Sequence, residues 1–152
     1  MAVTNIVKSA VGKAASDGGF KNAFGGWYKE SENVVITLDL QRSNYSALYY
    51  LNIKIYLKGA FGNSYEVTKY LIKNNIGNIF TRIPKEYVTF MNLDVDMDDH
   101  VRIMGIDNMF VNFVNPFAEQ MLSFEDIVLM VNKDEVTLFP AVKQELDKLM
   151  NK

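Results

Sequence analysis

The sequence contains no cysteine among its 152 residues. This absence excludes disulfide bonds, thiolate catalysis and every zinc site with cysteine ligands. Histidine occurs once, at His100, so neither a two-histidine metal site nor an HExxH motif can form. A catalytic triad would have to use His100, yet no serine lies in a Gly-x-Ser-x-Gly motif. We therefore predict no metal site, no cofactor and no catalytic residues, and no enzyme activity.

Long hydrophobic runs are also missing. No apolar stretch approaches the roughly 18–20 residues that a membrane span needs, and residues 1–16 do not contain the uninterrupted apolar core of a signal peptide. We expect a soluble, cytoplasmic protein without a membrane partner.

Charge is unevenly distributed along the chain. Residues 1–85 hold 11 Lys/Arg against 5 Asp/Glu, and residues 86–152 hold 5 against 13, which together give the net charge of −2. One interpretation is a nucleic-acid surface with an acidic appendage. The basic residues are scattered, however, so we predict that the basic half packs against the acidic half and that duplex DNA does not bind.

Residues 33–58 form the clearest pattern in the sequence. Apolar residues at every second position predict two strands of a long β-hairpin, with one face toward the core: Val34, Ile36, Leu38 and Leu40, then Tyr49, Leu51, Ile53, Ile55 and Leu57. The alternate positions are mostly polar and predict the opposite face of the sheet.

The remaining segments follow a helix, strands, helices order. We predict a first helix from the spacing of Val3 to Ala14, ended by Gly18-Gly19. Residues 20–30 are predicted as one strand in which Gly25-Gly26 marks a bulge or a close backbone approach. Residues 65–75 are ambiguous between strand and helix, and residues 77–84 predict a fourth strand.

The acidic half carries helical spacing. We predict an apolar stripe interrupted at Pro116, formed by Met97, Val101, Met104, Phe110, Phe113 and Val114. Ser123 should cap a helix that ends near Asn132. A last helix over residues 136–150 should carry on one face Leu138, Phe139, Val142, Leu146 and Leu149. The whole chain, 1–152, is thus predicted as one α+β domain with an antiparallel sheet of about four strands, packed with an N-terminal helix and C-terminal helices.

Short motifs in the basic half resemble an uncharacterised bacterial family, a domain of unknown function. They are Gly19-Phe20 after the first helix, Leu40-Gln41-x-Ser43, Tyr50-Leu51-Asn52-Ile53, and Arg82-Ile83. The likeness covers about residues 1–85, and the acidic half departs from it because it lacks the expected tryptophans. The resemblance implies the fold and brings no activity.

Two further patterns suggest sites. Asp94, Asp96 and Asp98 alternate like the start of a calcium loop, but the sixth and twelfth positions are Asp99 and Gly105, where such a loop needs Gly and Glu. We interpret these carboxylates as caps for the next helix. Six of the eight methionines lie between Met91 and Met130, which fits a helical core or an adaptable binding surface.

The second face of the hairpin is the candidate binding face. Its residues combine aromatic rings, amides and cations that can hold a ligand or a partner: Asp39, Gln41, Arg42, Tyr50, Asn52, Lys54, Tyr56 and Arg82. The alternatives are that helices or a second subunit cover this face, or that it is ordinary solvated sheet with an Asp39–Lys54 pair across the strands.

These observations favour a non-enzymatic protein-interaction module of the immunity or regulator type, with a protein partner or a homodimer. The alternative is that small molecules or single-stranded nucleic acid bind on the same face, stacking on Tyr50 and Tyr56 beside Arg42 and Lys54. An enzyme whose site contains no known motif is the third possibility.

Overall fold

The computed structural model describes residues 5–151. A first helix precedes a five-stranded antiparallel sheet, and a helical region follows. The helices are α1 (Ile6–Asp17), α2 (Asp99–Met109), α3 (Asn115–Gln120), α4 (Phe124–Asn132) and α5 (Pro140–Met150), with short helical turns η1 (Ala60–Gly62), η2 (Tyr70–Asn74), η3 (Lys85–Met91) and η4 (Phe110–Val114). The strands are β1 (Lys21–Ala23), β2 (Gly26–Glu30), β3 (Val34–Arg42), β4 (Tyr49–Leu57) and β5 (Ile79–Arg82). The predicted α+β class is confirmed.

The sheet has the order β1-β2-β3-β4-β5, and its centre is the predicted hairpin of β3 and β4. The predicted single strand over residues 20–30 is wrong, and the sheet therefore has five strands. Phe24 and Gly25 both have positive φ, 52° and 78°, which closes a tight turn between β1 and β2. Gly26 permits a close approach, since a Cβ there would lie 2.6 Å from the carbonyl oxygen of Leu38 and from a methyl carbon of Ile72.

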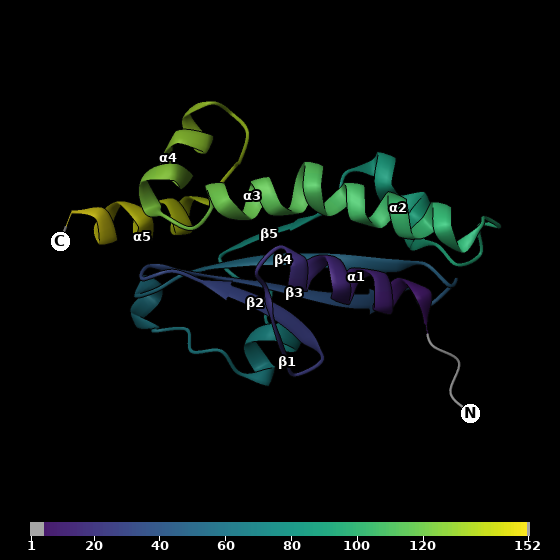
Figure 1. The fold of residues 1–152 in the computed structure, drawn as a ribbon. Helices are drawn as coiled ribbons and strands as arrows, with labels where there is room; N and C mark the ends of the chain where they lie inside the picture. The colour runs from purple at the N-terminus through teal and green to yellow at the C-terminus, as the bar shows by residue number, and fades with distance from the viewer. Residues whose placement is uncertain (1–4, 152) are drawn as a thin grey trace.

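Helices cover one face of this sheet. Figure 1 shows α2 and α3 as a nearly continuous rod along the sheet, with α1 below the rod and in front of β3 and β4. The core lies between these layers and takes the apolar face of the hairpin, together with Val7 and Val11 of α1 and Trp27 of β2. Val3, which belongs to the predicted stripe of the first helix, lies outside the described residues.

The two charge halves meet at this interface. Helix α1 packs beside α2, and Lys29 Nζ forms a 2.9 Å ion pair with Glu119 at the end of α3. Within residues 5–151 no helix is long and apolar enough to cross a membrane.

The buried face of α2 differs from the prediction. Arg102, Ile106 and Met109 point into the protein, whereas Val101 and Met104 are about half exposed. Hydrogen bonds of Arg102 explain this orientation of α2. The Arg102 guanidinium donates to the backbone oxygens of Phe90, Asn92 and Val95 at 2.7–2.9 Å. These three carbonyls lie in and after η3, and Arg102 must face them to satisfy them.

The predicted interruption of the helix at Pro116 is wrong. The chain forms a π-helical turn, η4, directly before it and continues as α3 with the proline in its first turn. A wider turn of this kind removes the need for the hydrogen bond that proline cannot donate.

Helix α4 begins at its predicted cap, whereas α5 begins four residues later than predicted, at Pro140 and not at Val136. Ser123 Oγ accepts a hydrogen bond from the Asp126 backbone N–H, and α4 ends at Asn132 as predicted. Helix α5 begins at Pro140 and buries Val142 and Leu146. Phe139 does not lie on the predicted apolar face of this helix, because it precedes the helix and is 75% exposed.

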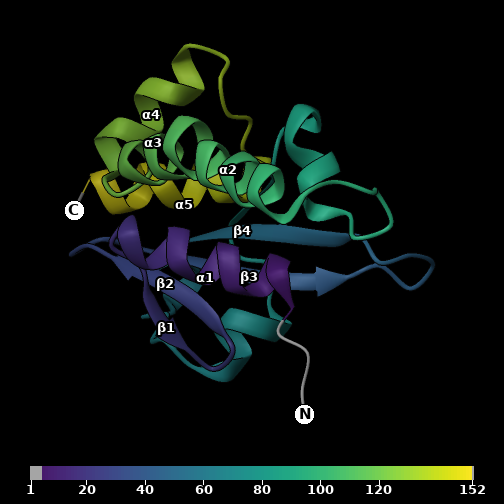
Figure 2. The ribbon, with the colours of Figure 1, turned by 45° about the vertical axis from the view of Figure 1, so that its right-hand side comes forward.

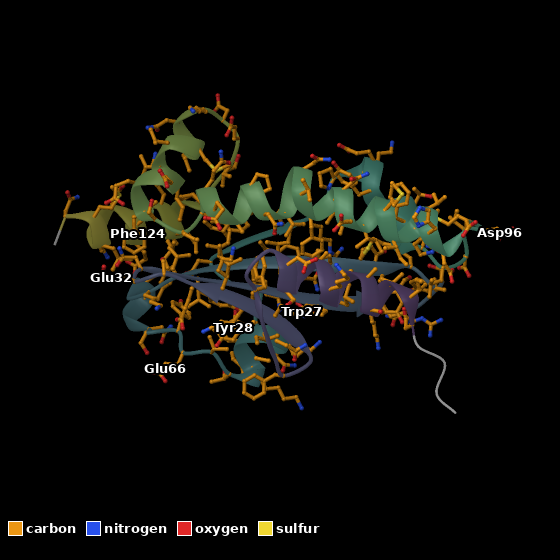
Figure 3. The ribbon with its side chains drawn as sticks, in the orientation of Figure 1. Trp27, Tyr28, Glu32, Glu66, Asp96 and Phe124 are labelled. Atoms are coloured by element: carbon orange, nitrogen blue, oxygen red, sulfur yellow. The ribbon has the colours of Figure 1, made fainter. Side chains whose placement is uncertain are left out.

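The segment between β4 and β5 covers part of the other face of the sheet. Residues 63–68 form neither helix nor strand, and η2 follows with Lys69 as its N-cap, which resolves the ambiguity of residues 65–75 as a short helical turn. Figure 1 shows this segment on the side of the sheet opposite the α2–α3 rod, and Figure 3 shows Tyr28 and Glu66 on the same side. The sheet is therefore covered completely on one face and partly on the other.

Candidate functional site

Side chains of three strands form a polar row on the second face of the sheet. The register places Asp39 opposite Asn52, Gln41 opposite Tyr50, and Asn52 opposite Arg82. We call the following set the polar row: Thr37, Asp39 and Gln41 of β3, Tyr50, Asn52, Lys54 and Tyr56 of β4, and Arg82 of β5. Strand alternation brings together seven of the eight residues that the sequence nominated, and Thr37 joins them.

One half of the polar row is sealed beneath η2. Lys54 and Asp39 have side chains only 3% and 7% exposed, and Lys54 Nζ lies 3.0 Å from Asp39 Oδ1. Lys54 Nζ also donates to the backbone oxygen of Ile72 at 2.7 Å. Two charges of opposite sign and a carbonyl thus satisfy one another away from water, which is the condition under which ionised groups are buried.

Tyr56 belongs to the same covered half. Its hydroxyl donates to the backbone oxygen of Leu71 at 2.6 Å, and its ring packs 5.1 Å from that of Tyr65. Burial raises the pKa of Tyr56, and the nearby negative charge of Asp39 raises it further. The phenol is therefore fixed as a neutral hydrogen-bond donor over a wide pH range.

The other half of the polar row is open. Arg82 and Gln41 are exposed, and Tyr50 is half-buried. The Arg82 guanidinium donates from Nε to Asn52 Oδ1 at 3.0 Å and from Nη2 to Gln41 Oε1 at 3.4 Å, and its Cζ lies 4.2 Å from the Tyr50 ring centroid. Asn52 in turn donates to Gln41 Oε1 at 3.1 Å. Neutral amides and a ring thus hold this cation in place.

No carboxylate of residues 5–151 forms an ion pair with Arg82. The ion pairs of residues 5–151 involve Lys13, Lys29, Lys54, Lys58 and Lys148, and none includes this arginine. A guanidinium has five N–H donors in a planar fork that matches a carboxylate or phosphate. The donors that Asn52 and Gln41 leave free can bind such a group from a ligand or partner.

Arg42 does not belong to this surface. It is opposite Tyr49 in the register, so alternation places it on the side of the sheet that carries the apolar face. It lies at the end of β3, beside the hairpin tip that projects from the body in Figure 2. The predicted face therefore consists of a covered group, an open group and one residue on the opposite side.

Exposed apolar side chains gather around Phe80, which lies two positions from Arg82 on β5. Ile76, Phe80 and Phe139 are 70%, 43% and 75% exposed, and they line a shallow hollow with Asn78, Ile79 and Thr137. The Arg82 guanidinium lies 5.6 Å from the Phe80 ring centroid. Sequence reasoning missed this hollow, although the alternation of Phe80 with Arg82 on β5 placed both on one face. Local spacing could not predict that Phe139 lines this hollow, because its position depends on how the chain packs against β5 before α5 begins.

The other nominated sites have structural roles. Asp98 accepts a hydrogen bond from the His100 backbone N–H and caps α2, and Asp94 Oδ2 accepts one from the Ala47 backbone N–H. Figure 3 shows Asp96 at the end of the molecule opposite Phe124. Residues 5–151 contain no group of three or more His, Asp or Glu side chains that could hold a metal ion. Met91, Met109, Met121 and Met130 are buried in the core.

Comparison with known families gives one match. The family model described as Domain of unknown function (DUF4304) matches residues 11–120. The matched range includes the motifs from Gly19 to Ile83 and continues through α2 and α3. No curated protein and no solved structure matches the chain.

Proposed function

Since the chain belongs to the DUF4304 family, a domain of unknown function, we propose from its geometry that it is a non-enzymatic protein-interaction module of the immunity or regulator type. The proposed contact surface is the open half of the polar row with the apolar hollow beside it. The observation that carries this proposal is Arg82, an exposed cation that Asn52, Gln41 and Tyr50 hold in place and that has no carboxylate partner in the described part of the chain.

The residue types of this surface support protein binding. Arginine and tyrosine are enriched among the residues that dominate the affinity of protein interfaces. Holding the guanidinium in one geometry before binding lowers the conformational entropy that association would otherwise cost. Exposed Phe80 beside it supplies apolar area, so a cation and an apolar contact lie next to each other. This combination is typical of an interface centre with a polar rim.

The alternative function, stacking of single-stranded nucleic acid on the sheet, has less support. Tyr56 is fully buried and packs against Tyr65, so its ring offers no platform for a base. Tyr50 already carries the Arg82 guanidinium over its ring. Among the cations nominated for phosphates, Lys54 is paired with Asp39 and Arg42 lies on the opposite side of the sheet.

Photo-crosslinking in the cells that produce the protein tests the proposed function. We would place a photoreactive residue at Gln41, within the surface, and as a matched control at Glu125, an exposed residue on α4. We expect a protein adduct at position 41 that is absent at position 125. The identified protein should bind the purified chain in calorimetry, and Arg82→Glu should weaken that binding at least tenfold. No adduct specific to position 41, or equal binding by both forms, would contradict the proposal.

A further inference from the structure

Strand β5 is an open edge of the sheet. Within residues 5–151 it pairs with β4 alone, and no other backbone segment hydrogen-bonds to Ile79–Arg82. An unpaired edge presents a row of N–H and C=O groups to which another strand can add. The four residues of β5 include no lysine and no proline, the residues with which proteins commonly block such an edge.

The opposite edge differs. Strand β1 has only three residues and begins with Lys21. A short strand with an exposed lysine is poorly suited to pairing. The two edges of one sheet are therefore unequal, and the edge without such protection is the one beside the open half of the polar row.

Side-chain spacing indicates what an added strand would carry. Phe80 and Arg82 lie two positions apart on β5 and face the same side. Residues directly opposite them in a new strand would likewise be two positions apart and within contact distance. The residue beside Arg82 should be an aspartate or glutamate, because this guanidinium has free donors and no ion-pair partner among the described residues. The residue beside Phe80 should be apolar and would lie over Ile76 and Phe139.

A second copy of the chain does not fit this requirement. Residues 76–85 contain no aspartate or glutamate, and their charged residues are Arg82 and Lys85. Pairing β5 with β5 of another copy would therefore add cations without supplying a carboxylate. Charge complementarity favours a different protein.

We infer that the edge of β5 binds an extended acidic segment of a partner protein, which adds a sixth strand to the sheet with an acidic residue beside Arg82 and an apolar residue beside Phe80. This inference rests on the proposed function and specifies its partner and its mode of binding. Backbone hydrogen bonds to β5 would provide affinity, and the two side-chain contacts would provide specificity.

Selection of a random 12-residue peptide library on the purified full chain tests the inference. Enriched peptides should contain an acidic residue two positions from an apolar one. They should bind Arg82→Glu and Arg82→Gln at least tenfold more weakly, and the matched control Arg42→Glu within twofold. Selection on Arg82→Glu should replace the acidic residue with lysine or arginine. Circular dichroism and urea unfolding would check that each variant is folded.

Hydrogen exchange locates the bound peptide. A selected peptide should slow amide exchange in residues 79–82 and leave residues 21–23 at the other edge unchanged. Enriched peptides without an acidic residue, equal binding to Arg82→Gln, protection elsewhere, or no enrichment would each overturn the inference. Concentration-dependent dimerisation with protection of residues 79–82 would also overturn it, in favour of a second copy. In these cases the adduct at position 41 would still decide the proposed function independently.

Discussion

Lys54 and Arg82 are the two cations of the polar row, and they lie one diagonal step apart on paired strands. Lys54 is buried and bound to Asp39 and to the backbone oxygen of Ile72. Arg82 is exposed, and its contacts within residues 5–151 are with neutral groups: the amides of Asn52 and Gln41 and the rings of Tyr50 and Phe80. Both side chains lie on the same face of the sheet, so the alternation of residues along the strands cannot explain why one is buried and the other exposed.

The difference comes from the segment that covers one half of the row. A short helical turn leaves most of its carbonyl groups without partners inside the turn. In η2 two of these oxygens, of Leu71 and Ile72, accept hydrogen bonds from Tyr56 and Lys54. Gly26 lets the segment approach, because a larger residue would collide with Ile72. The covered residues of this sheet face therefore bond to η2, whereas the open residues are free of that segment, which is why we propose binding for the open half alone.

The largest expected effect is on the covered half. Asp39→Ala leaves the Lys54 ammonium buried without its carboxylate, which we expect to lower the free energy of unfolding by about 3–5 kcal/mol. Gln41→Ala, the matched control on the same strand in the open half, should cost less than about 1 kcal/mol. Urea unfolding measures both. Similar losses for the two variants would remove the distinction between the halves.

Tyr56→Phe should have an intermediate effect. Loss of the hydroxyl leaves the buried oxygen of Leu71 without a donor, at a cost of about 1–3 kcal/mol near pH 7. The raised pKa of Tyr56 means that the neutral phenol is favoured in the folded state. Its stabilising contribution is therefore complete below the unfolded pKa of about 10 and is lost as the pH rises above it, by about 1.4 kcal/mol per unit.

The pH dependence distinguishes this cause from a packing defect. In urea unfolding between pH 9 and 11.5, wild type should lose its advantage over Tyr56→Phe above pH 10. A constant difference across that range would show that the phenol ionises equally in the folded and unfolded states.

The smallest effect is expected at the acidic segment near Asp94–His100. Its carboxylates cap α2 and the hairpin tip through backbone N–H groups, as Asp98 and Asp94 show. We predict that neither calcium nor a chelator changes the melting temperature. A metal present at a hundred times its dissociation constant would add about 2.7 kcal/mol, which a melting scan would detect. A melting temperature that rises with calcium and falls again with a chelator would contradict this prediction and show that the acidic segment binds a metal ion.

Local spacing predicted those parts of the fold that depend on local physics. The apolar alternation of β3 and β4, the end of α1 at Gly18 and the Ser123 cap are confirmed, and the motifs correctly indicated an uncharacterised family. The tight turn at Phe24-Gly25 was not predicted, because it requires a positive φ at Phe24, which phenylalanine seldom adopts. The same local reasoning joined β1 and β2 into one strand.

Long-range contacts set the limits of that prediction. Val101 and Met104 were predicted to lie on the apolar stripe of α2, but three carbonyl groups outside the helix bind Arg102 and turn that residue inward instead. The polar row could be read from the alternation of β3 and β4, whereas its division into covered and open halves depends on η2, about 15 to 18 residues away from its partners Tyr56 and Lys54. The spacing of residues along β3 and β4 does not indicate that η2 covers half of the polar row.

The central claim is that the two cations of the polar row have different roles. The most direct test compares the free energies of urea unfolding of Lys54→Met and Arg82→Met near pH 7. Lys54→Met should lose about 3–5 kcal/mol because Asp39 remains buried and unpaired. Arg82→Met should lose less than about 1 kcal/mol, because water can replace an exposed side chain. Equal losses, or a larger loss for Arg82→Met, would contradict the division on which the proposed binding surface depends.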